Sequence, residues 1–164
     1  MEPTYEMVSK WFDAYFGQVC KKQGNLETVV ELKKFFAPDF ELRMHTAPSQ
    51  APRTMSRDAL LMSFVHPGLQ EDILPQQYVI DLKQKIVAVQ FEIRFHDEAS
   101  GKNWAPIQAS AHYHLTPGDG DPKIRRIEYW TGTLPEDLFD IWAQRRTEAL
   151  TGHAQAYISA GKEC

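Results

Sequence analysis

Cysteine is scarce in this sequence of 164 residues, which contains only Cys20 and Cys164. One lies in an expected first helix and the other at the last residue, which matches neither a disulfide framework nor a zinc pattern. We therefore expect two free thiols and no metal ion. The sequence also has no glycine-rich phosphate loop and no Gly-x-Ser-x-Gly motif, which leaves acid/base chemistry without a cofactor.

Long apolar runs and clustered basic charge are missing too. No apolar stretch approaches the roughly 18 residues of a membrane span, and residues 1–20 mix Glu2, Glu6, Lys10 and Asp13 with aromatic side chains, unlike a signal peptide. We therefore expect a cytoplasmic protein that enters no membrane. The net charge is −4, the pI is near 5.8 and the basic residues are scattered, so no electrostatic footprint for nucleic acid is present.

Aromatic side chains are plentiful, at 12% of the residues. The four Trp, six Tyr and nine Phe give more flat apolar surface than packing requires. This excess fits a pocket lined by rings that binds a small apolar organic molecule. The length suits one core, and we expect residues 1–164 to form a single domain.

The spacing of apolar residues predicts an α+β fold, because positions three and four apart indicate helices and alternation indicates strands. The expected elements are a helix over 5–19, a short helix over 26–36 stopped by Pro38, a strand over 40–45, a helix with Ser56 as its N-cap, strands over 76–82, 86–96, 104–116 and 123–133, and a final helix from Leu134 to a stop at Gly152. Short turns between the last four strands predict an antiparallel meander.

This order of elements, with FFAPDFELRM after the second helix and KIRRIEYWTG in the last strand, resembles the nuclear transport factor 2-like superfamily. The superfamily includes SnoaL-like polyketide cyclases, ketosteroid isomerase, limonene epoxide hydrolase, scytalone dehydratase and fungal natural-product isomerases. The resemblance spans residues 5–145. It implies a cone-shaped, curved antiparallel sheet whose N-terminal helices enclose an apolar pocket.

Residues Trp11 to Tyr15 carry a W-x-D-x-Y pattern similar to the first helix of scytalone dehydratases. The similarity implies that Tyr15 lies in the pocket. Three positions differ from that family: Phe16 stands where it has an Asp, Met44 where it has a Tyr, and Tyr78 where it has a catalytic His. The dehydratase mechanism is therefore not implied, and we expect Tyr78 to contact a ligand without doing chemistry.

The strand near residue 110 offers candidates on both faces. Ala109, Ala111 and Tyr113 share one face, where two small residues beside a phenol leave room for a ligand. A core tyrosine bonded to a backbone carbonyl fits the same pattern equally well. His112 and His114 share the other face, where we expect a subunit interface because no third metal ligand is evident.

Simple alternation in the last strand places Tyr129 on one face and Glu128 and Trp130 on the other, and a single bulge would exchange them. Buried beside aromatic rings, Glu128 would serve as a general base; at the surface it would pair with Arg126. Arg43 lies on the first strand, where its guanidinium would hold a developing enolate or carboxylate oxygen, or else face solvent.

His66 closes the third expected helix, directly before Pro67 and Gly68. Helix ends often border the pocket mouth in the fold that the sequence resembles. A helix C-terminus also carries partial negative charge, and we expect His66 to interact with that dipole.

Two hypotheses of different classes follow. The first is a cofactor-independent isomerase or cyclase that uses acid/base catalysis on an apolar polyketide, terpenoid or alkaloid intermediate. Its expected catalytic residues are Glu128, Tyr113 and Arg43, and its expected substrate-binding residues are Tyr15, Tyr78, Tyr129, Met44, Phe91 and Trp130. The second is a non-catalytic small-molecule-binding protein or an oxygenase-associated small subunit of the same fold.

The outer face of the predicted sheet is polar and too broad for one helix to cover. It carries His112 and His114 beside Glu92 and Arg94 of the neighbouring strand. We therefore expect a homodimer packed through the sheets, with a monomer as the alternative.

Overall fold

The computed structural model describes residues 3–22, 26–45, 51–118 and 120–150. The elements in chain order are α1 (Tyr5–Lys22), α2 (Leu26–Glu31), the 3₁₀ helix η1 (Leu32–Phe35), β1 (Phe36–His45), β2 (Arg53–Ser56), α3 (Arg57–Ser63), β3 (Leu69–Asp81), β4 (Ile86–Asp97), β5 (Ile107–Leu115), β6 (Ile124–Thr131) and α4 (Glu136–Leu150). The predicted α+β class is confirmed. The two cysteine thiols and the helix stop expected at Gly152 lie outside the described side chains.

The strands form one curved sheet of six, in the order β2-β1-β6-β5-β4-β3. Strands β3 to β6 pair antiparallel, which confirms the predicted meander. The expectation of a wholly antiparallel sheet needs one correction, because β1 runs parallel to β6 with Arg43 opposite Glu128. Parallel neighbours need a long crossover, and β2 to β5 all lie between these two strands in the sequence.

Strand β3 begins well before the expected residue 76. It runs from Leu69, and its pairing with β4 shifts register between Pro75 and Gln77. Pro75 has no N–H to donate to a neighbouring strand, and such residues occur at bulges and edges. Because the pairing is irregular there, the first part of the strand shows no regular alternation of apolar residues in the sequence. Glu71 lies in this part, so it belongs to the sheet and not to a loop.

The region before α3 also differs from expectation. Strand β1 begins at Phe36, which was expected to end the second helix, and not at residue 40, and the short strand β2 was not expected. Helix α3 begins as predicted, since the Ser56 side chain accepts a hydrogen bond of 3.3 Å from the backbone N–H of Ala59.

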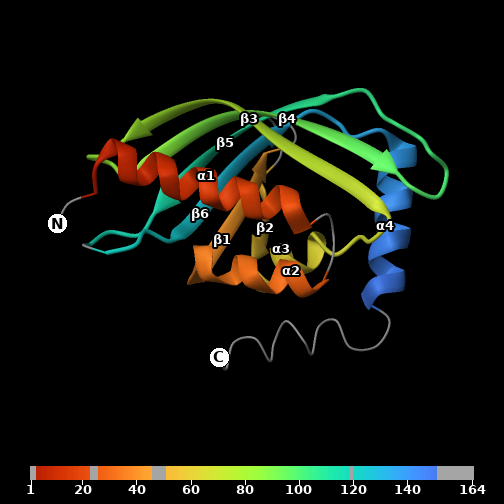
Figure 1. The fold of residues 1–164 in the computed structure, drawn as a ribbon, viewed down its shortest axis with the longest axis horizontal. Coiled ribbons are helices and arrows are strands. Elements are labelled where there is room, and N and C mark those ends of the chain that lie inside the picture. The colour runs from red at the N-terminus through yellow and green to blue at the C-terminus, as the bar shows by residue number, and fades with distance from the viewer. Residues whose placement is uncertain (1–2, 23–25, 46–50, 119, 151–164) are drawn as a thin grey trace.

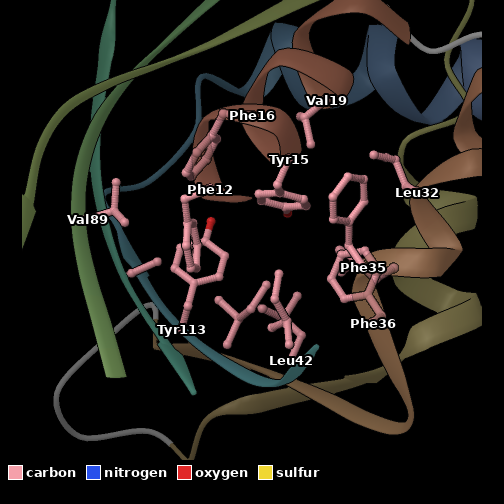
Figure 2. Close-up of a cluster of buried hydrophobic side chains, with 14 of the residues drawn as sticks. Phe12, Tyr15, Phe16, Val19, Leu32, Phe35, Phe36, Leu42, Val89 and Tyr113 are labelled. Atoms are coloured by element: carbon pink, nitrogen blue, oxygen red, sulfur yellow. The ribbon is translucent and has the colours of Figure 1, made fainter. Parts of the chain in front are cut away.

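Helix α1 packs inside the curve of the sheet (Figure 1). Its buried residues follow the three-and-four spacing of the sequence: Val8, Phe12, Tyr15, Phe16 and Val19. Figure 2 shows Phe12, Tyr15 and Phe16 turned towards Tyr113 of β5. In the described part of the chain, no helix is long and apolar enough to cross a membrane.

Candidate active site

A cavity lies on the concave side of the sheet. Its walls come from α1, β1, β2, α3, all four strands of the meander and α4. Ligand pockets typically have a mainly apolar lining with a few polar groups. Apolar and aromatic side chains dominate this lining too, so the cavity suits a small apolar organic molecule.

Five of the predicted pocket residues line this cavity. Tyr15 comes from α1, Met44 from β1, Phe91 from β4, Tyr113 from β5 and Tyr129 from β6. Alternation along β5 and β6 therefore selects the concave face correctly at Tyr113 and Tyr129.

Glu128, Arg43 and Trp130 do not line the cavity. The carboxylate of Glu128 lies 3.6 Å from Arg43 on the other face of the sheet, and Arg43 also pairs with Glu41 at 3.2 Å. Trp130 stacks on His45 of β1 with the ring centres 5.0 Å apart. The pairing of β6 with β1 is regular through these residues, so no bulge turns them inward.

Tyr78 lies beside α1, outside the main cavity. Its hydroxyl donates to Asp13 at 3.3 Å, and its ring stacks on Phe16 with the centres 6.2 Å apart. Burial and the carboxylate of Asp13 raise the pKa of Tyr78. These contacts connect β3 to α1.

The room expected beside Ala109 and Ala111 is absent, because neither alanine lines the cavity. Phe12 and Phe16 of α1 fill the space next to Tyr113, with ring centres 5.2 and 5.9 Å from the Tyr113 ring. Ala109 and Ala111 therefore allow α1 to pack closely against β5, and the cavity lies further along the sheet.

Three buried phenols in the cavity keep their protons at neutral pH. Burial raises the pKa of Tyr15, and a hydrogen bond with Tyr113 only partly offsets this. Burial also raises the pKa of Tyr113 well above its usual value, and it raises that of Tyr129 to about 12. Because one proton lies in the Tyr15–Tyr113 hydrogen bond, the other phenol of that pair and Tyr129 can donate to an oxygen that gains negative charge.

Glu71 is the one charged side chain among the described residues that line the cavity. It sits near the start of β3, opposite Phe95 of β4. Its negative charge further raises the pKa of Tyr15 and of Tyr129, which line the same cavity. No motif or alternation pattern in the sequence marks Glu71.

His66 lies directly behind Glu71 and is only 1% exposed. Its Nε2 is 3.0 Å from Glu71 Oε2, and its Nδ1 is 2.9 Å from the carbonyl oxygen of Leu69. The expected role at a helix end is therefore corrected, because both ring nitrogens bond to the start of β3.

A tight turn places the His66 ring. Pro67 and Gly68 occupy the two central positions, Gly68 has a φ of 86°, and the backbone N–H of Leu69 donates to the carbonyl of His66 at 3.2 Å. Proline followed by a residue of positive φ is the signature of a type II turn. The His-Pro-Gly sequence is the signal from which this turn could have been predicted.

Helix α4 closes the cavity with Leu138 and Trp142. The indole N–H of Trp142 donates to the carbonyl of Ser63 at 3.1 Å, and its ring lies edge-on to His66. Arg145 holds the same helix to the buried Asp97 at 3.3 Å. Trp142 therefore helps to shield His66 from solvent.

The described residues hold no group of three His, Cys, Asp or Glu side chains close enough to bind a metal ion. On the outer face, His112 contacts Trp130 edge-on with ring centres 4.8 Å apart. His114 is on that face as well, and burial lowers its pKa.

No protein-family model matches the chain, and no curated protein matches its sequence. Solved structures do match. The structure of AusH from Aspergillus nidulans has a TM-score of 0.63 and 12% identity, over 92% of this chain and 98% of that one. SalBIII, an epoxide hydrolase/cyclase-like enzyme in pyran ring formation of the polyether salinomycin, has a TM-score of 0.56 and 17% identity, over 78% and 92%.

A third match carries the fold name itself. It is a nuclear transport factor 2-like protein from Anabaena variabilis, with a TM-score of 0.55 and 14% identity, over 82% of this chain and 96% of that one. Identities this low establish a common fold and nothing about the reaction. The chain has the nuclear transport factor 2-like fold that its sequence resembles.

Proposed function

We propose that this protein is a cofactor-independent isomerase or cyclase that acts by acid/base catalysis on an apolar polyketide, terpenoid or alkaloid intermediate of secondary metabolism. One observation carries the proposal: a single carboxylate, Glu71, lines a mainly apolar cavity together with protonated phenols. Glu71 takes the role of acid/base group that the sequence suggested for Glu128, which pairs with Arg43 on the far face.

The geometry suits proton transfer next to a carbonyl group. Glu71 removes a proton from a carbon adjacent to the carbonyl, and the electron pair of that C–H bond moves to the carbonyl oxygen. A phenol of Tyr15, Tyr113 or Tyr129 stabilises this oxygen by hydrogen bonding. Return of the proton to a different carbon completes an isomerisation, and attack of the enolate carbon on a second electrophilic group of the same molecule closes a ring.

The comparisons support the substrate class. SalBIII takes part in pyran ring formation, and a further match, TerC, was crystallised with polyporic acid. TerC has a TM-score of 0.53 and 12% identity, over 83% of this chain and 97% of that one. The apolar lining of the cavity fits molecules of this kind.

The reaction class can be tested with β-tetralone, an apolar bicyclic ketone with acidic protons beside its carbonyl. We expect the protein to bind this ketone and to speed the exchange of those protons for deuterium in heavy water, followed by NMR against the buffer rate. Binding without any acceleration, across a panel of bicyclic ketones, would contradict catalysis. It would favour the second hypothesis, a non-catalytic binding protein or oxygenase-associated subunit.

We also propose that the outer sheet face forms a homodimer. His112 and His45 flank Trp130 there, and an aromatic cluster on an open sheet face favours a covered surface. Histidines at a dimer interface place like charges together when the pH falls, which weakens association. We expect sedimentation to show a dimer at about pH 8 and weaker association at about pH 5.5. A monomer at both values would contradict the dimer, and an unchanged dimer would contradict the histidine role.

A further inference from the structure

The contacts of His66 dictate where its protons lie. The carbonyl oxygen of Leu69 can only accept, so Nδ1 of His66 must carry the hydrogen of their 2.9 Å bond. A neutral imidazole with that tautomer has a lone pair on Nε2. An ionised Glu71 also offers only lone pairs, and its Oε2 is 3.0 Å from Nε2. Two acceptors at this distance are held together only if a proton lies between them.

We propose that His66 and Glu71 share one proton and that His66 is a positioning residue which sets the ionisation of Glu71. The inference rests on the proposed role of Glu71 in catalysis. Two arrangements satisfy the geometry: an imidazolium beside a carboxylate, or an imidazole beside a carboxylic acid. Both are neutral overall, and the third arrangement, imidazole with carboxylate, is excluded by the facing lone pairs.

Burial supports a neutral pair. The side chains of His66 and Glu71 are 1% and 16% exposed, and desolvation strongly disfavours an isolated charge at such a site. On helix α4, Arg145 pairs with Asp97. The phenols of Tyr15 and Tyr129, which line the same cavity as Glu71, are protonated.

The shared proton narrows the substrate class. With a neutral pair and protonated phenols, the groups described at the site carry no net charge, so the cavity favours an uncharged substrate whose oxygen accepts a phenol hydrogen bond. When Glu71 takes a proton from the substrate, the pair gains one positive charge as the substrate oxygen gains one negative charge. Attraction between these charges stabilises the enolate, and the pair then returns a proton to carbon.

The proton can be observed without an activity assay. We expect ¹⁵N NMR of histidine-labelled protein at about pH 7 to show Nδ1 of His66 protonated, and either a protonated Nε2 or a protonated carboxyl band of Glu71 in the infrared spectrum. In the Glu71→Gln variant, Nδ1 keeps its proton while Nε2 becomes an acceptor. A lone-pair signal for Nε2 in the wild-type protein, with no protonated carboxyl band, would overturn the proposal.

The functional part needs a second variant, His66→Gln. Glutamine can still donate a hydrogen bond to Glu71, but its amide group does not titrate in the pH range of the assay. We expect the wild-type rate of ketone proton exchange to change in one step at high pH, where the pair loses its proton, and the His66→Gln variant to lack this step. An identical pH profile with unchanged thermal stability would limit His66 to a structural role and overturn the inference. If the NMR shows the shared proton but no protein variant accelerates exchange, the proposed function fails and the proton assignment stands.

Discussion

Replacing Glu71 by Gln is expected to lower the rate of ketone proton exchange by about 10²- to 10⁴-fold, the usual contribution of a general acid or base. Glutamine has the same shape, and its amide N–H can donate to Nε2 of His66, so the fold and the turn before β3 are retained. The amide cannot accept a proton from carbon at neutral pH. The loss therefore isolates the chemistry of the carboxylate from its packing.

The matched control is Glu128→Gln, which removes the carboxylate that simple sequence reasoning favours. Glu128 lies outside the cavity beside Arg43, at 24% exposure of its side chain, so the exchange rate should stay at the wild-type value. Initial rates in heavy water, with ketone below saturation, compare both variants under one condition. Equal losses of exchange rate in the two variants, or a loss only in Glu128→Gln, would contradict the assignment of the acid/base role to Glu71.

The parts of this protein that follow a strong local period could be predicted from sequence. Helix α1 shows its buried face in the three-and-four spacing of Phe12, Phe16 and Val19. Strand β6 alternates cleanly, so Tyr129 and Glu128 fall on opposite faces as the simplest reading of the pattern has it. A cavity position for Glu128 requires a bulge in β6, whereas β6 pairs regularly with β1 at this residue.

The acid/base pair could not be found in this way, because its members lie on an irregular segment. Glu71 precedes the register shift near Pro75, where alternation fails and the strand looks like a loop. Its partner His66 is five residues earlier, and only the turn at Pro67-Gly68 brings the ring against the strand. Local turn chemistry predicts such a turn, but the direction of the ring depends on tertiary packing under Trp142.

Packing between distant segments also decided where the cavity lies. The alanines of β5 suggested empty space beside Tyr113, yet the rings of α1 occupy it. Alanines on a strand show only that another group can pack closely against it, and they do not identify that group. Whether a helix or a ligand does so depends on segments nearly a hundred residues away, which no local pattern contains.

Phe12→Ala is expected to destabilise the protein by about 3 to 5 kcal/mol, the usual cost of removing a fully buried phenylalanine ring. Phe12 is 0% exposed, and its ring lies edge-on to Trp11, Tyr15 and Tyr113 with centres 5.1 to 6.2 Å apart. The substitution removes both buried apolar area and these ring contacts, and it leaves a hole between α1 and β5. Urea unfolding followed by circular dichroism measures the loss.

Tyr5→Ala on the same helix is the control, because Tyr5 is 54% exposed and a surface change of this kind stays within about 0.5 kcal/mol. If Phe12→Ala unfolds at the same urea concentration as Tyr5→Ala, α1 is not the central wall of the core. The hole would also free the ring of Tyr113 to move. Because this phenol depends on Phe12 and Phe16 for its position, a folded Phe12→Ala protein should bind β-tetralone more weakly than the Tyr5→Ala control.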